Sequence, residues 1–121
     1  MKRITSIMTL ALIAASTATA QNAPPTYQAD PDVYKLIFED ANFRVIAQAW
    51  KKGARDKDHS HPVPSVVYAL TDCSLRVHAP DGTTRDVLPK AGSATPIVIT
   101  PSHFVENVGD SDCRSVLIER K

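Results

Sequence analysis

Apolar residues recur along this chain in short runs, each closed by turn-forming residues. Beyond residue 20 no run keeps a helical 3.6-residue period. The runs are rich in β-branched and aromatic residues and follow one another at the spacing typical of an all-β sandwich or barrel. We therefore predict strands over 34–39, 43–50, 66–70, 75–78, 84–88, 97–100, 103–107 and 114–120. One small antiparallel barrel is the simplest fold that uses them all.

The first twenty residues follow a different pattern. Lys2 and Arg3 precede an apolar run over 4–15, and Ala18-Thr19-Ala20 has the small-x-small form of a signal-peptidase site. The run is shorter than the roughly 20 apolar residues that span a bilayer. We interpret 1–20 as a signal peptide cleaved after Ala20, which predicts a periplasmic or secreted protein without a stable membrane anchor. An uncleaved anchor is the alternative.

The remaining chain is long enough for a single domain. Residues 21–33 contain three prolines and few apolar side chains, so we expect a flexible leader there and a barrel over 34–121. The sequence has 14 basic and 13 acidic residues. Without Lys2 and Arg3 the mature chain has 12 basic and 13 acidic residues, so its net charge is 12 − 13 = −1, and the sequence shows no basic stripe. This balance argues against nucleic acid as a partner.

Two cysteines, Cys73 and Cys113, remain in the mature chain. An exported protein folds in an oxidising compartment, so an even number of cysteines suggests a disulfide. Two buried free thiols are the alternative.

His59 and His61 are two residues apart in a stretch that Pro62 biases towards extended backbone. Alternation places both imidazoles on one face, with Cα atoms about 6.6 Å apart. Two imidazoles at this spacing can converge on one metal ion. Taken alone, the pair is more typical of solvated residues in a polar loop than of metal ligands. His103 by itself indicates little, and we expect His78 to face solvent.

The spacing of these residues resembles the two motifs of the cupin family. Gly53, five residues, His59-Ser60-His61 is similar to the opening of the first motif. His103, three residues, Asn107 is similar to the end of the second. The resemblance covers roughly 34–121 and implies an all-β, single-domain cupin jelly-roll β-barrel. It also implies that His59, His61 and His103 are metal ligands.

The sequence departs from the family pattern at the fourth ligand. The metal-binding glutamate would fall at Ser65 or Val66, and Glu106 is expected on the strand face opposite to His103. Three neutral imidazoles would hold a hard ion less tightly and leave more positions open. Zinc, iron, copper and nickel all suit imidazole ligands. A site without any metal, and a simple polar pocket in its place, is the alternative.

The resemblance also bears on the cysteines. In the cupin topology the strand that ends before Cys73 and the last strand, which begins near Cys113, are antiparallel neighbours. A Cys73–Cys113 bridge would close a loop of about 40 residues, worth roughly 4 kcal/mol in the chain-entropy model.

These features lead to one main functional hypothesis. We expect a small periplasmic or secreted cupin whose divalent metal serves an oxygenase- or isomerase-type reaction on a small molecule. A non-catalytic module that binds a small ligand or a metal is the alternative, and a structural dimer protein is a third option. Cupins often pair, so a homodimer is a further expectation. The sequence assigns no catalytic residue and no organic cofactor, and whether the protein is an enzyme stays open.

Overall fold

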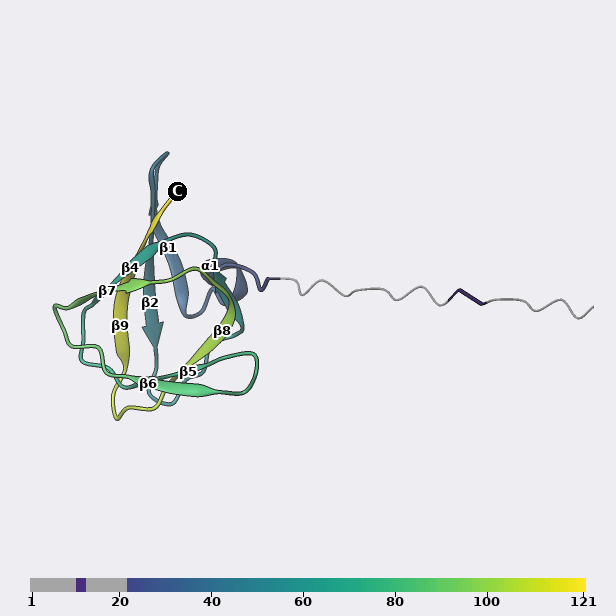
Figure 1. The fold of residues 1–121 in the computed structure, drawn as a ribbon. Helices are drawn as coiled ribbons and strands as arrows, with labels where there is room; N and C mark the ends of the chain where they lie inside the picture. The colour runs from purple at the N-terminus through teal and green to yellow at the C-terminus, as the bar shows by residue number, and fades with distance from the viewer. Residues whose placement is uncertain (1–10, 13–21) are drawn as a thin grey trace, which may run out of the picture.

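The computed structural model describes residues 11–12 and 22–121 (Figure 1). The predicted signal peptide over 1–20 lies outside the described residues except for residues 11–12, which are exposed. Among the described residues, no helix has the length and apolar character needed to cross a membrane.

Two antiparallel sheets make up the barrel (Figure 1). Five strands form the larger sheet in the order β1-β2-β9-β4-β7: Tyr34–Glu39, Phe43–Trp50, Cys113–Arg120, Ser65–Ala69 and Ala94–Ile97. Four strands form the smaller sheet in the order β3-β8-β5-β6: His59–His61, Thr100–Asn107, Leu75–His78 and Thr84–Val87. The fold class predicted from the sequence, all-β, is confirmed.

Most predicted strands match within two or three residues, but one is displaced. We expected a strand over 97–100, whereas β7 spans Ala94–Ile97 and includes Pro96. Proline lacks an N–H and is normally confined to edge strands. β7 is such an edge, because in the larger sheet it pairs only with β4. The proline therefore does not interrupt a ladder on both sides.

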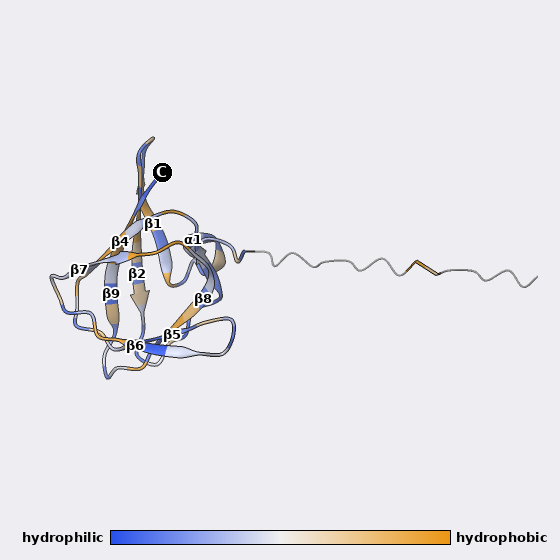
Figure 2. Cartoon of the chain, viewed as in Figure 1, coloured by the Kyte–Doolittle hydropathy of each residue, from blue (hydrophilic) through white to orange (hydrophobic). Residues whose placement is uncertain are grey.

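Alternation along the strands builds the core. In β9, Cys113, Ser115, Leu117 and Glu119 are buried while the residues between them are more exposed. Figure 2 shows hydrophobic and hydrophilic residues interleaved along the strands, as expected when one face of a sheet lines the inside of a barrel. The apolar core gathers residues from both sheets, among them Tyr34, Ile46, Trp50, Leu75, Val105 and Leu117.

A disulfide joins Cys73 and Cys113, with their Cα atoms 5.3 Å apart. β4 and β9 pair as antiparallel neighbours, so the end of β4 lies beside the start of β9. Both cysteines belong to the buried core. The predicted bridge is thus confirmed, together with the topological reason for it.

The expectation of a flexible leader over 21–33 is wrong for residues 22–33, which pack against the barrel. A short helix, α1, spans Thr26–Ala29, and Thr26 is fully buried. Ser60 N donates to Pro24 O at 2.9 Å, and Ala23 N donates to Pro101 O at 3.1 Å. The prolines that suggested flexibility instead lie in a segment whose Pro24 carbonyl accepts a hydrogen bond from β3 and whose Ala23 N–H donates one to β8. We call residues 22–33 the strap.

Candidate metal centre

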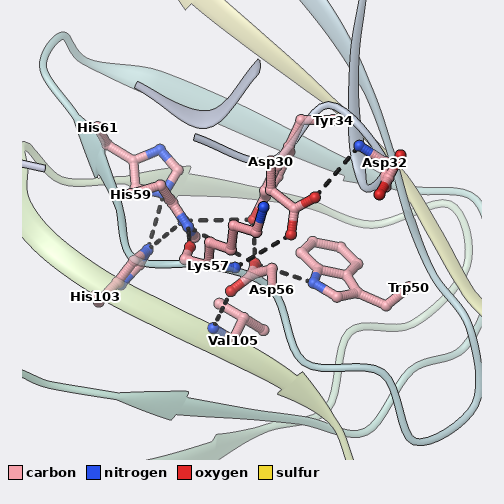
Figure 3. A network of polar contacts seen from close by, with 10 residues as sticks. All are labelled: Asp30, Asp32, Tyr34, Trp50, Asp56, Lys57, His59, His61, His103 and Val105. Atoms are coloured by element: carbon pink, nitrogen blue, oxygen red, sulfur yellow. Dashed lines mark hydrogen bonds and ion pairs between the residues drawn. The ribbon is translucent and has the colours of Figure 1, made fainter. Parts of the chain in front are cut away.

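Three histidines meet on the inner side of the smaller sheet (Figure 3). His59 and His61 lie on β3, and His103 lies on the neighbouring β8. His59 is paired with His103, and a register shift then pairs His61 with Thr100. Because β3 places both of its imidazoles on the inner side, the histidine of β8 lies against the two of them.

The three Nε2 atoms point at one another. His103 Nε2 lies 2.9 Å from His59 Nε2 and 3.0 Å from His61 Nε2. With metal–nitrogen distances of about 2.1 Å, two ligand nitrogens are about 3.0 Å apart at a right angle and about 3.4 Å apart at a tetrahedral angle. The two spacings from His103 therefore suit neighbouring ligands of a single ion, and the ligand atoms of all three histidines lie within 4.8 Å of one another.

The hydrogen bond of His59 leaves its Nε2 with a lone pair that can bind a cation. His59 Nδ1 lies 2.9 Å from the Lys57 carbonyl oxygen, which can only accept. This bond places the proton of His59 on Nδ1 and leaves a lone pair on Nε2. His103 Nε2 carries at most one proton when neutral, so it cannot satisfy both of its nitrogen neighbours by ordinary hydrogen bonds. A metal ion would satisfy all three, so the donor set fits one.

Burial keeps two of these imidazoles neutral. Burial, and then the neighbouring His59 and His103, together lower the pKa of His61 to about 3. Burial likewise lowers the pKa of His103 to about 4, with smaller contributions from His59 and Arg85. Neutral imidazole is the form that binds metals, so these ligands are ready at physiological pH.

A buried carboxylate, Asp56, lies beside the cluster on the Nδ1 side of His59. It was not predicted from the sequence. Its Oδ2 accepts hydrogen bonds from Tyr34 Oη at 2.5 Å and from Trp50 Nε1 at 3.1 Å, and its Oδ1 accepts from Val105 N at 2.6 Å (Figure 3). The same Oδ2 lies 3.7 Å from His59 Nδ1. Asp56 thus connects β1, β2 and β8 beside the first histidine.

This role was not predicted, because Asp56 stands in the charged run Arg55-Asp56-Lys57-Asp58. A charged run of this kind predicts solvent-exposed side chains. Asp56 is nevertheless only 4 % exposed, although its neighbours in the sequence are exposed. Burial raises the pKa of the Asp56 carboxyl, against the opposing effect of His59 and of its hydrogen-bond donors. Burial, and then the nearby Asp56, raises the pKa of Tyr34 well above its usual value.

The histidines form part of the wall of a cavity of about 400 Å³ inside the barrel. Most of the remaining wall is apolar, including Val67, Leu75, Val77, Val87, Ile97 and Val105. Tyr34 and Trp50 also line it. A mainly apolar cavity with a few convergent polar groups is the usual form of a small-molecule site.

Comparison with known proteins identifies the architecture. A cupin domain protein from Bordetella pertussis aligns with 84 % of this chain and 99 % of its own, with a TM-score of 0.68 at 20 % identity. A cupin-2 domain protein from Shewanella frigidimarina covers 74 % of this chain and 81 % of its own, with a TM-score of 0.51 at 15 % identity. This chain has the cupin fold.

A larger cupin is also similar. Oxalate decarboxylase of Bacillus subtilis, described with Mn(II) centres, covers 66 % of this chain and 22 % of its own, with a TM-score of 0.52 at 24 % identity. No family model and no curated protein matches the sequence. At these identities the similarity shows the fold alone.

The metal-binding glutamate of the cupin motif was expected at Ser65 or Val66, whose side chains lie on opposite faces of β4. Ser65 is buried, and its Oγ donates to the Val63 carbonyl, whereas Val66 is 42 % exposed. Neither belongs to the metal-ligating group, which in the described part of the chain consists of the three histidines. The cupin barrel therefore presents three imidazoles and no carboxylate.

The other motif positions have structural roles. Asn107 is buried, and its Nδ2 donates to the carbonyls of Trp50, Lys51 and Ser111, which closes the end of β8 onto the adjacent loops. Glu106 points away from the cluster, as expected, and its Oε1 lies 3.1 Å from His78 Nε2. His78 is more enclosed than we expected, because it also stacks on Phe104.

Proposed function

We propose that this protein is an exported cupin that binds one divalent metal ion through His59, His61 and His103 and presents it to a small molecule in the barrel cavity. The main support is the contact of His103 Nε2 with the other two Nε2 atoms on the cavity wall. Zinc, iron(II), copper and nickel are the metals suited to this donor set. With three protein ligands, positions would remain open for water or an organic ligand.

The test is a metal-binding measurement on matched variants. Metal content is determined by elemental analysis of protein purified from its native compartment, and apo protein is titrated calorimetrically with zinc and with iron(II) under anaerobic conditions. We expect one metal per chain, and at least a tenfold loss of affinity when any of the three histidines is replaced by alanine. His78→Ala is the control, because His78 contacts Glu106 outside the cluster. Binding by His103→Ala equal to that of wild type would exclude the three-histidine site.

We further propose an oxygenase- or isomerase-type reaction on a small molecule. A bound metal would supply Lewis-acid or redox chemistry to an oxygen-bearing ligand. Most of the cavity wall is apolar, and the chain's own residues would bind and orient the ligand. Fold alone does not fix a reaction, so turnover by metal-loaded protein has to be measured directly.

One observation favours a non-catalytic module as the second candidate. Among the described residues, no Asp or Glu lines the cavity. The histidines would be occupied as ligands of the proposed metal. Few groups are then left for general acid–base chemistry at physiological pH. Tight ligand binding without turnover by protein loaded with zinc, iron or copper would support the binding module over the enzyme.

Export is the remaining part of the proposal. The basic start, apolar run and Ala-Thr-Ala of 1–20 support it, and the Cys73–Cys113 disulfide agrees with a non-reducing compartment. Intact mass spectrometry of native protein should give a chain that begins at Gln21. A full-length cytoplasmic product would contradict export without affecting the metal proposal.

A further inference from the structure

A buried polar pair, Gln48 and Ser115, faces the same cavity as the three histidines. Gln48 is 4 % exposed and Ser115 is 5 % exposed, and both line the cavity. Ser115 Oγ donates to Gln48 Oε1 at 2.6 Å, which orients the amide. Among the described residues, no acceptor is observed for Gln48 Nε2, and this atom is not one of the fully buried polar atoms that lack a partner. Its N–H groups therefore open onto the cavity, where they can donate to an oxygen of a ligand.

The sheet register places this pair beside Tyr34, whose hydroxyl contacts the histidine cluster. Tyr34 of β1 is the cross-strand partner of Gln48, and Gln48 is the partner of Ser115. Facing side chains on neighbouring strands lie about 4.5–5.5 Å apart at Cβ. Tyr34 Oη in turn lies 3.4 Å from His59 Nε2. Because Gln48 and the three histidines line one cavity, a small molecule that fills it could contact the histidine-bound metal with one end and Gln48 with another group.

The charges of the cavity wall favour an anion. Arg85 and Lys90 line the cavity, and no acidic residue does so in the described part of the chain. Arg85 also lines the adjoining surface hollow that shares His103 with the cavity. A divalent ion held by three neutral imidazoles would add two positive charges. The site would thus attract a negatively charged ligand both at the metal and at its entrance.

We propose that the ligand is a small organic acid with an apolar body, whose carboxylate binds at the histidine centre and whose second oxygen accepts a hydrogen bond from Gln48 Nε2. This inference rests on the proposed metal site. Ser115 acts as a positioning residue, since its hydroxyl holds the amide oxygen and turns the amide nitrogen towards the ligand. The apolar wall then packs against the body of the molecule.

Three matched probes separate these contributions. 4-Oxo-4-phenylbutanoate has a carboxylate, a ketone oxygen and a phenyl group; 4-phenylbutanoate lacks the ketone; and 4-oxo-4-phenylbutanamide lacks the charge. Calorimetric titration of zinc-loaded full-length mature protein should give tighter binding of the keto acid than of 4-phenylbutanoate, by roughly threefold to tenfold, the range for one neutral hydrogen bond. The neutral amide should bind at least tenfold more weakly than the keto acid.

Two substitutions of Gln48 test its role. Gln48→Leu should abolish the preference for the keto acid while leaving the affinity for 4-phenylbutanoate within twofold of wild type. Gln48→Glu retains an oxygen for Ser115 but adds a negative charge, so it should weaken binding of both acids. Gln28→Leu, at an exposed position of α1, is the control and should change neither affinity. Thermal unfolding of each variant establishes that it is folded.

The outcomes distinguish this inference from the proposed metal site. Zinc content is measured on every sample before titration. Zinc-loaded wild-type protein that binds the amide as tightly as the acid, or shows no preference for the ketone, overturns the inference and leaves the metal site intact. Loss of affinity for both acids in Gln48→Leu also overturns it. Protein that takes up no zinc refutes the metal site, and a Gln48-dependent preference for the ketone in that apo protein would still support the Gln48 subsite.

Discussion

Asp56 shows how much a single buried residue can determine at this site. It accepts three hydrogen bonds, from Tyr34, Trp50 and Val105, and it lies beside His59. A buried carboxylate is costly unless its oxygens are satisfied, and here each is. The same bonds fix Tyr34, which packs edge-on against His59, and Trp50, which packs against Tyr34, so the position of His59 depends on groups outside the histidine cluster.

We predict that Asp56→Ala lowers the free energy of unfolding by at least about 3 kcal/mol, because three donors lose their acceptor at about 1–3 kcal/mol each. It should also weaken zinc binding, since His59 loses its supporting shell. Asp56→Asn keeps one acceptor oxygen and should be milder. Urea unfolding and zinc titration measure both effects. Asp58→Ala, two residues away and exposed, is the control, and equal effects of the two alanine variants would contradict the prediction.

The low pKa values of His61 and His103 predict how metal-free protein responds to acid. In the unfolded chain these imidazoles titrate near 6.5, whereas burial lowers their pKa to about 3 and about 4 in the folded protein. Between these values the unfolded chain binds protons that the folded protein excludes. The contribution of the two residues to stability is therefore complete above pH 6.5 and is lost as the pH falls towards 4.

The melting temperature of chelator-treated protein should accordingly fall between pH 7.5 and pH 5. The double variant His61→Asn, His103→Asn should show a flatter dependence over this range, because it lacks both buried imidazoles. His78→Asn is the matched control and should keep the wild-type slope. Parallel curves for wild type and the double variant would refute this explanation.

At the scale of elements, the strap holds the strand that bears two of the three histidines. Its Pro24 carbonyl accepts from Ser60 N, between His59 and His61, and Asp30 Oδ2 accepts from Lys57 N. Asp30 Oδ1 also accepts from Asp32 N. The short strand β3 would otherwise have one sheet neighbour, β8. The strap therefore holds β3, and with it His59 and His61, through backbone hydrogen bonds.

We predict that Asp30→Ala destabilises the protein by about 1–2 kcal/mol and weakens zinc binding, because the loop before His59 loses an anchor. Asp32→Ala serves as the control, since Asp32 is exposed and only its backbone N–H takes part in this contact. Chemical denaturation and zinc titration are the measurements. Unchanged zinc affinity in Asp30→Ala would show that β3 is held without the strap.

The elements also show what the sequence could and could not predict. Strands β1, β2 and β5 were predicted with correct bounds, because alternation and turn residues are local signals. The three histidines were found through their spacing and the family resemblance. Asp56 and the Gln48–Ser115 pair were missed, because their burial depends on contacts between residues that are far apart in the sequence. The strap was missed because its prolines suggest a flexible segment. The hydrogen bond that the Pro24 carbonyl accepts from Ser60 N exists only in the folded structure.

For the whole molecule, the disulfide is the strongest long-range constraint. It joins the start of the last strand to the turn after β4, while the cavity lies between the two sheets and both cysteines line it. A bridge across 40 residues of sequence removes entropy from the unfolded chain, by roughly 4 kcal/mol in the chain-entropy model. A domain of this size buries only about two-thirds of its surface, so this is a large share of its stability.

We therefore predict that reduction, or the double variant Cys73→Ala, Cys113→Ala, lowers the free energy of unfolding by up to about 4 kcal/mol. Native protein should have no titratable thiol under denaturing, non-reducing conditions. The cavity wall should loosen as well, so that reduced protein binds its organic ligand more weakly than oxidised protein at equal zinc content. Ser74→Ala, next to the bridge in sequence, is the control for local disturbance. Two titratable thiols in native protein would rule the bridge out, and with it the link between the stability of the barrel and an oxidising compartment.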